Sequence, residues 1–120
     1  MDGYRRQAEL YKALAHPVRL RILEILARQE ACVCHLTALL RKPQPYVSQQ
    51  LSMLRDANLV ADRREGTLIY YHLADPGVAE LLAAGRRAAP GEGGLAVPEG
   101  PVPGCPCPRC AQAQGRPALP

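Results

Sequence analysis

The sequence lacks an apolar run of the roughly 20 residues that a membrane-spanning helix needs. Its first residues, from Met1 to Arg6, lead into no hydrophobic segment, so no secretory signal is expected. It also has no evident Ser-His-Asp set, paired carboxylates or phosphate-binding glycine loop, which argues against an enzyme. We therefore expect a non-catalytic protein of the cytoplasm with no membrane partner.

Proline and glycine are scarce over most of the chain. Eight of the 12 prolines and six of the 10 glycines lie from Pro90 onwards. The net charge of +4 lies wholly in residues 1–89, because the last segment has two arginines and two glutamates. This division predicts a small globular domain over residues 1–89 and a flexible extension over residues 90–120. A domain of that size has a modest core, which favours oligomerisation.

Helical periodicity predicts four helices before residue 58. We expect them over residues 4–15, 17–28, 33–40 and 45–57. Pro17 and Pro45 suit the first turn of the second and fourth helices. The third and fourth helices are joined by the four-residue turn 41–44, and the fourth is polar on its free face, a pattern typical of helix-turn-helix.

Two β-runs, residues 59–64 and 67–73, follow the helices and flank a tight turn at Glu65-Gly66. Asp75 and Pro76 then favour the start of a last helix that ends near Arg87. The order α-α-α-α-β-β-α predicts a mainly helical winged helix-turn-helix fold, in which the β-hairpin is the wing.

The polar face of the fourth helix suits double-stranded DNA. Glutamine amides pair with adenine in the major groove, serine contacts bases or phosphates, and nearby arginine and lysine contact the backbone. The predicted DNA-contacting residues are Arg41, Lys42, Gln44, Tyr46, Ser48, Gln49, Ser52, Arg63 and Arg64. For any single residue, an ordinary solvated surface position is about as good an interpretation. The combination of polar helix, wing and positive charge favours DNA.

Residues 8 to about 88 resemble the ArsR/SmtB winged-helix metalloregulators. The resemblance rests on the segments Ala13 to Leu23, Cys32 to Leu36, Val47 to Leu54 and Gly66 to Tyr71. It implies a homodimer, packed through the first and last helices, that represses transcription until a metal or metalloid releases it from operator DNA. The residues expected at that dimer contact are Tyr11, Leu14, Val78 and Leu82.

Cys32 and Cys34 are candidate ligands for arsenite or a soft divalent ion such as Cd(II), Pb(II) or Zn(II). Positions i and i+2 of a regular helix point about 200° apart, so joint binding requires an irregular helix start. The resemblance implies a third cysteine at position 37 for many arsenic sensors, but this sequence has Thr37. Buried structural cysteines are the alternative interpretation.

Three more cysteines, Cys105, Cys107 and Cys110, lie in the Pro/Gly-rich extension. The roughly 15 residues from Pro90 to Cys105 span on the order of 20 Å when flexible, so these thiols can complete the site in either subunit. A separate tail site, a Cys107/Cys110 redox pair or a dispensable tail are the alternatives. His35 could serve as a spare ligand, but a partly exposed helix residue is the better interpretation. Residues 76–89 contain no histidine, which disfavours a zinc site on the last helix.

Three functions are consistent with these features. The leading hypothesis is a metal- or metalloid-responsive repressor. The second is a repressor of the same fold that senses thiol redox state or persulfide. The third is a metal-sequestering thiol protein with no role at DNA, which the complete helix-turn-helix and wing disfavour.

Overall fold

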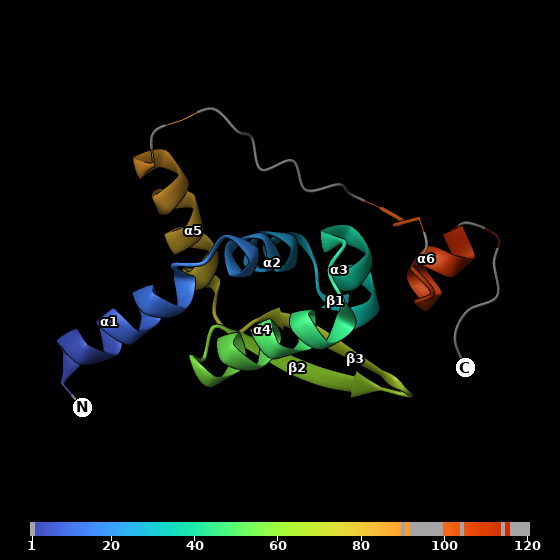
Figure 1. The fold of residues 1–120 in the computed structure, drawn as a ribbon, viewed down its shortest axis with the longest axis horizontal. Coiled ribbons are helices and arrows are strands. Elements are labelled where there is room, and N and C mark those ends of the chain that lie inside the picture. Colours follow the sequence, from blue (N-terminus) through green and yellow to red (C-terminus); the bar gives the residue numbers. More distant parts are fainter. Residues whose placement is uncertain (1, 90, 92–99, 104, 114, 116–120) are drawn as a thin grey trace.

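The fold was analysed in a computed structural model that describes residues 2–89, 91, 100–103, 105–113 and 115. It contains six helices and three strands within those residues (Figure 1). In chain order they are α1 (Gly3–Leu14), α2 (Pro17–Arg28), β1 (Ala31–Cys32), α3 (Val33–Leu40), α4 (Gln44–Asp56), β2 (Val60–Glu65), β3 (Leu68–Leu73), α5 (Pro76–Ala88) and α6 (Pro108–Ala113).

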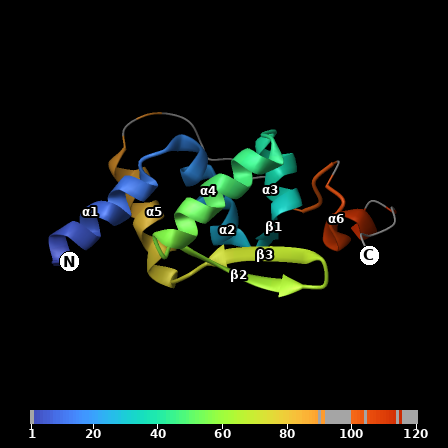
Figure 2. The same ribbon diagram turned by 60° about the horizontal axis from the view of Figure 1, so that its bottom comes forward.

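The helices and the sheet are arranged along one long axis. Figures 1 and 2 show α1 and α5 at one end of the molecule, with α6 at the other end beside α3 and β1. Helix α2 lies in the centre and contacts α1, α3, α4, α5 and β3. The hairpin of β2 and β3 extends along one side of this bundle.

Short-range hydrogen bonds explain several helix starts. The side chain of Asp2 accepts a hydrogen bond from the Arg5 N–H at 2.8 Å, and Asp75 accepts one from Gly77 at 2.7 Å. The His16 imidazole accepts from the Val18 N–H at 3.2 Å, and Pro17 fixes the backbone for the first turn of α2. Each cap satisfies a backbone donor that the helix itself leaves free.

The helix-turn-helix consists of α3, a short turn and α4. Arg41 ends α3 in the left-handed conformation, with φ 54° and ψ 44°, and its N–H bonds to the Thr37 carbonyl. Helix α4 begins at Gln44, one residue before the expected Pro45. Figure 2 shows α4 running across the front of the bundle, above the hairpin.

The sheet has three antiparallel strands in the order β1-β3-β2. The hairpin pairs Arg63 with Tyr70 and Arg64 with Ile69, and Gly66 turns the chain with φ 61°. Strand β2 runs one residue further than predicted, so the turn lies at Gly66-Thr67 rather than Glu65-Gly66. Strand β1 lies outside the elements that periodicity predicts and pairs Cys32 with Tyr70.

One main core holds the winged helix together. Its buried residues are Ile22, Leu23, Ile25, Leu26, Ala31, Leu36, Leu40, Val47, Leu51, Leu54, Leu59, Val60, Tyr71, Val78 and Leu82. The predicted bounds of α2 and α3 match the structure, and the winged helix-turn-helix fold is confirmed. Among the described residues, no helix combines the length and apolar character that a membrane crossing requires.

Candidate functional site

A second buried cluster lies apart from the main core, where α6 packs beside α3. We call it the sulfur cluster; its buried members are Cys32, Tyr70, Val102, Cys105, Cys107 and Cys110. The three cysteines of the C-terminal segment are 0–2% exposed. The five cysteines, none of them in a disulfide bond, come together here from positions far apart in the sequence.

Cys32 and Cys34 can bind one ion together only if at least one of them lies outside the regular helix, and the structure meets this condition. Cys32 has extended backbone angles, φ −79° and ψ 163°, and stands at the N-cap of α3. Its sulfur accepts a hydrogen bond from the His35 N–H at 3.4 Å. Cys34 lies in the first turn of α3 and is half-buried. The strand-to-helix junction thus turns both thiols towards the same region.

Helix α6 and the residues before it place the other three thiols. The Cys105 N–H bonds to the Val102 carbonyl at 3.0 Å, and the Ala111 N–H bonds to the Cys107 carbonyl at 2.8 Å. The Cys110 sulfur accepts a hydrogen bond from the Val102 N–H at 3.3 Å. This local network folds the Cys105–Cys110 stretch around its own sulfur atoms.

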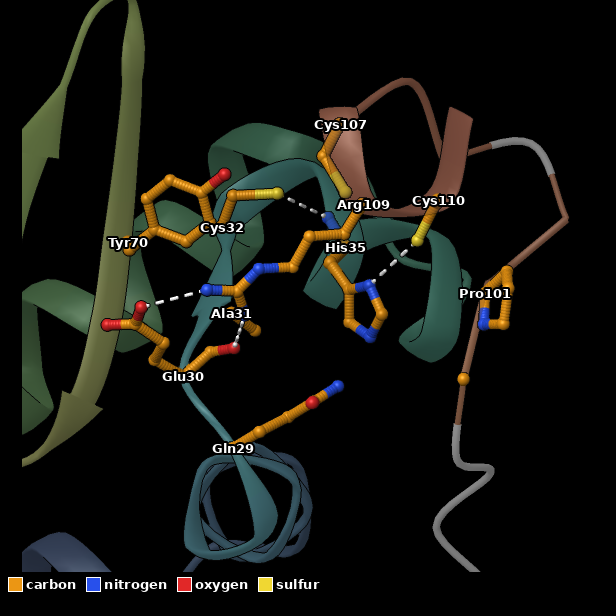
Figure 3. Close-up of a pocket in the computed structure, with 11 residues that line it drawn as sticks. Gln29, Glu30, Ala31, Cys32, His35, Tyr70, Pro101, Cys107, Arg109 and Cys110 are labelled. Atoms are coloured by element: carbon orange, nitrogen blue, oxygen red, sulfur yellow. Dashed lines mark hydrogen bonds and ion pairs between the residues drawn. The ribbon is translucent and has the colours of Figure 1, made fainter. Parts of the chain in front are cut away.

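His35 is a buried member of the site rather than the partly exposed helix residue that the sequence suggested. It is 6% exposed, and its Nδ1 lies 3.3 Å from the Cys110 sulfur (Figure 3). Burial lowers the pKa of His35, and the positive charge of Arg109 acts in the same direction. A neutral imidazole is the form that binds metal ions.

Six side chains make up two possible sets of metal ligands. One set is Cys32, Cys34, Cys105 and Cys107, and the other is His35, Cys105, Cys107 and Cys110. Within each set, the ligand atoms lie within 4.8 Å of one another. Sulfur donors with one imidazole suit soft or borderline ions such as Zn(II) and Cd(II) and do not suit Mg(II) or Ca(II).

The surroundings keep several of these thiols protonated. Contact with the Cys34 thiol, together with burial, raises the pKa of Cys32 above its ordinary range. Burial raises the pKa of Cys105 and of Cys110 as well. A metal ion must therefore displace protons to bind, and its positive charge supplies the energy that deprotonates the thiols.

An ion-pair junction connects the site with the wing. Arg63 of β2 donates from Nε to Glu30 at 2.9 Å, forms a second close contact with that carboxylate, and donates to Glu65 at 2.7 Å. Arg109 of α6 donates to the same Glu30 carboxylate at 3.0 Å and to its backbone carbonyl at 3.2 Å. Both guanidinium groups lie over the Tyr70 ring, 4.8 and 5.1 Å from its centroid.

The pKa of Glu30 reflects this junction. Hydrogen bonds from Arg63 lower the pKa of its carboxyl to about 2, and Arg109 adds to the effect. A cavity of about 200 Å³ lies beside the junction and the sulfur cluster (Figure 3). Its wall includes Gln29, Glu30, Cys32, His35, Tyr70, Pro101, Cys107, Arg109 and Cys110.

The predicted DNA-contacting residues lie on α4, its preceding turn and the hairpin. Arg41, Lys42, Gln44, Gln49 and Arg64 are exposed, whereas Tyr46, Ser48 and Ser52 are half-buried on the same helix. Arg63 is also exposed but differs from the others, because its guanidinium forms ion pairs with Glu30 and Glu65 of the same chain. The two arginines expected on the wing therefore differ in their pairing, since the contacts of Arg63 must open before its guanidinium can bind a phosphate.

The four predicted dimer residues also separate into two groups. Tyr11 is 47% exposed and Leu14 is half-buried, both on α1. Val78 and Leu82 of α5 are 7% and 6% exposed and belong to the main core of the single chain. Because those two side chains pack inside one chain, the accessible part of the expected contact lies on α1.

Several residues of the site were not among the sequence-based candidates. Glu30, Tyr70, Val102 and Arg109 act through pairing across the fold, and none stands in a motif that marks a role. His35 did carry a signal, because it directly follows Cys-x-Cys, and cysteine and histidine together are the usual ligands of zinc.

Comparison with known proteins relates the winged helix-turn-helix part of the chain to transcriptional regulators. A family described as bacterial regulatory protein, arsR family, matches residues 16–62. An uncharacterised HTH-type transcriptional regulator of Methanocaldococcus jannaschii is 41% identical over 83 residues, covering 68% of this chain and 93% of that protein. A transcriptional repressor SmtB homologue of Synechocystis is 47% identical over 81 residues, covering 68% and 61%.

Two further proteins are similar to this chain, one in sequence and one in structure. The arsenic resistance transcriptional regulator ArsR1 of Pseudomonas putida is 43% identical over 65 residues, covering 53% of this chain and 51% of that one. The solution structure of a homodimeric winged helix-turn-helix DNA-binding domain from Mycobacterium bovis is similar with a TM-score of 0.68 and 35% identity. That match covers 71% of this chain and 79% of the other.

Proposed function

Because this chain belongs to the ArsR/SmtB family of winged-helix DNA-binding repressors, we propose that it represses transcription as a homodimer on operator DNA and is released by a thiophilic ion. The releasing ion is arsenite or a soft divalent cation such as Cd(II), Pb(II) or Zn(II). The relatives include an arsenic resistance regulator, which supports this class of inducer.

The observation that carries the proposal is the convergence of five thiols and one imidazole on the start of α3. Cys32 and Cys34 supply two sulfur atoms, and Cys105 and Cys107 bring two more within 4.8 Å. The resemblance implied a third cysteine at position 37, where this chain has Thr37. Ligands from the C-terminal segment take the place of that missing thiol. The donor set is soft, and soft donors select the proposed ions over Mg(II) and Ca(II).

Two connections link this site to the surface that reads DNA. The first runs along α3, whose N-cap is Cys32 and whose end leads through Arg41 into α4. The second runs through Glu30, which holds Arg109 of α6 and Arg63 of the wing together. Tightening of the thiols around an ion shifts the start of α3 and α6 together. Both movements act on groups that face the operator, which is a physical route for coupling the two sites.

DNA binding and dimerisation are supported by independent features. The exposed polar residues of α4 lie beside Arg41 and Lys42, as major-groove reading and phosphate contact require. Helix α1 has no buried residue although it carries Leu10, Tyr11 and Leu14. A second subunit packed against α1 would cover that apolar surface, and the similar Mycobacterium bovis domain is a homodimer.

A redox or persulfide switch is the competing function, and the thiols distinguish it. Thiolates, rather than thiols, react with oxidants. Burial and thiol contacts raise the pKa values of Cys32, Cys105 and Cys110, which makes these groups slow nucleophiles until a cation displaces their protons. The grouping of four sulfur atoms from two distant segments within 4.8 Å of one another supports ion sensing.

The test is a titration of arsenite, Cd(II) and Zn(II) into a complex of the full chain with a labelled duplex selected from random sequence. The wild type is compared with Cys32→Ser/Cys34→Ser and with a chain that ends at Ala89. At least one ion should lower the wild-type affinity by about 5- to 150-fold, the usual range of coupling between two sites. Both variants should still bind DNA but show no response.

His72→Asn is the matched control, because His72 lies on β3 outside both ligand sets. It should bind DNA and respond to ions as the wild type does. Unchanged wild-type affinity with all three ions would overturn the proposal. Release by peroxide or polysulfide, reversed by a thiol reductant and absent with metals, would select the redox alternative instead.

A further inference from the structure

The two ligand sets described above overlap. Cys105 and Cys107 belong to both, whereas Cys32 and Cys34 occur only in the first set, and His35 and Cys110 only in the second. The sets are therefore not two independent sites. An ion bound by one set also fixes the positions of the Cys105 and Cys107 sulfur atoms in the other set.

The distances are close to those of a formed tetrahedral centre. A zinc ion bound at 2.3 Å to each sulfur holds its sulfur atoms about 3.8 Å apart. Since no pair of ligand atoms within a set is separated by more than 4.8 Å, each set needs to contract by at most about 1 Å. Side-chain rotations and a slight shift of α6 against the start of α3 supply a contraction of that size, so neither helix needs to refold.

One ion cannot use all six ligands. A tetrahedral ion in the first set leaves His35 and Cys110 without metal, although both are nearly fully buried and lie 3.3 Å apart. A tetrahedral ion in the second set leaves Cys32 and Cys34 without metal. A thiolate sulfur has lone pairs for more than one ion, so two bridging thiolates allow each of two ions to have four ligands.

Charge permits the arrangement with two ions. One divalent ion with the four thiolates of the first set carries two excess negative charges. One ion with the three thiolates and neutral imidazole of the second set carries one, and two ions with all five thiolates and the imidazole also carry one. Buried net charge is costly. The shared cysteines are 0% and 2% exposed, and Arg109, a cation that borders this region, is already paired with Glu30. A second ion therefore coordinates the remaining buried ligands without adding to the negative charge of a single ion in the second set.

We propose that each chain binds two divalent ions, Cd(II) or Zn(II), in one dinuclear centre bridged by the thiolates of Cys105 and Cys107. Cys32 and Cys34 complete the coordination of one ion, and His35 and Cys110 complete that of the other. Five thiol protons are displaced when all five cysteines bind. This inference rests on the proposed function, because it describes the ion-bound state that leaves the operator.

The experiment uses the full, reduced, metal-free chain and Cd(II) alone. Native mass spectrometry should find two Cd(II) per chain. With ¹¹³Cd, nuclear magnetic resonance should give two signals of equal intensity that are split by coupling to each other through the bridging sulfur atoms. Neither measurement depends on a variant that must fold.

Substitutions then assign the ligands. Cys34→Ser and Cys110→Ser should each lower the number of tightly bound ions from two to one, and the remaining signal should lose its splitting. Cys105→Ser/Cys107→Ser should bind no ion tightly, whereas the control His72→Asn should keep both. Circular dichroism of each variant checks that the main core remains folded.

A saturating stoichiometry of one ion per chain would overturn the proposal. So would two signals with no mutual coupling, which indicate separate sites. Operator binding is measured on the same samples. Release with only one bound ion would refute the dinuclear centre and leave the proposed function intact, while two coupled ions on a chain that stays on DNA would do the reverse.

Discussion

The main core and the sulfur cluster are both buried, but they consist of different residue types. Fifteen residues form the main core within the described chain, and most are leucine, isoleucine or valine from neighbouring elements. The sulfur cluster has six buried members, four of them cysteines, and it joins His35 to a residue 75 positions later. One is stabilised by apolar area, and the other by a few polar contacts between small side chains.

This difference shows how a sensor can keep its fold while its ligand site changes. A large aliphatic core is stable whatever the ion concentration, since burial of each leucine or isoleucine contributes roughly 1.5–3 kcal/mol. Cysteine side chains bury less apolar surface, and closing a long chain segment costs entropy. On the proposed function, we therefore expect the C-terminal segment to be held weakly without an ion and firmly with one.

The largest expected difference between the main core and the sulfur cluster is in the loss of unfolding free energy when a buried side chain of each is truncated. Leu51 is fully buried in the main core, so Leu51→Ala should lower the free energy of unfolding by about 2–5 kcal/mol. Cys110→Ala should lower it by less than half as much, because residues 17–82 keep their packing. Urea unfolding followed by circular dichroism measures both. Equal losses would mean that the two regions fold as one unit.

Metal should change the stability of only one region. An ion at 100 times its dissociation constant stabilises the state that binds it by about 2.7 kcal/mol. Cleavage by trypsin after Arg109, whose side chain is 49% exposed, should therefore slow by about 100-fold with Cd(II) and recover with a chelator. The rate is read by mass spectrometry of the released fragments. Cys105→Ser/Cys107→Ser, which removes the two thiols shared by both ligand sets, should show no protection by Cd(II), and equal protection there would contradict an ion held by these thiols.

The wing offers a smaller contrast between neighbouring arginines. Arg64 is exposed, whereas Arg63 is bound to Glu30 and Glu65. Arg64→Ala should therefore reduce the salt dependence of DNA binding by about one phosphate contact, a change of about 0.9 in the log–log slope. Arg63→Ala should change that slope less in the metal-free protein. Fluorescence anisotropy at several salt concentrations compares the two, and a larger effect of Arg63→Ala would show that its ion pairs open on DNA.

The smallest expected effect concerns acid. The pKa of Glu30 lies at about 2, below its ordinary value of 4.5, because Arg63 and Arg109 stabilise the carboxylate. A lowered pKa contributes stability that is complete above pH 4.5 and is lost as the pH falls from 4.5 towards 2. Glu30→Gln should remove this part of the pH dependence. Thermal unfolding of both proteins between pH 5 and pH 2.5 tests it, and parallel curves would show that the junction contributes nothing.

The sequence predicted the main core better than the sulfur cluster, for a physical reason. Helix α2 and the wing bury regular apolar stripes, and periodicity records those stripes directly. Strand β1 has only two residues, and its pairing with β3 depends on the finished fold. A strand that short has no period to detect, so it could not be predicted from spacing.

The ligand site was predictable as a set of residue types but not as a geometry. Cysteines are conspicuous in a short sequence, and all five were candidates before their positions were known. The sequence offered His35 as a possible ligand, but its burial was not predicted, because it depends on α6, whose Cys110 lies 75 positions later. The Glu30 junction was missed because a charged residue at a helix end is ordinarily solvated.

The N-cap of α3 is a cysteine, Cys32, and this choice of residue affects both the stability of the helix and the binding of an ion. An oxygen of serine, aspartate or asparagine is the preferred N-cap acceptor, and sulfur is a weak one. Cys32→Ser should therefore leave α3 as well capped or better, even as it removes a ligand. Cysteine at this position gives α3 a weaker N-cap than serine would, but it supplies a sulfur atom that can bind an ion. On the proposed function, helix capping and ion binding therefore place opposite demands on one side chain, whose sulfur caps α3 with a hydrogen bond of 3.4 Å.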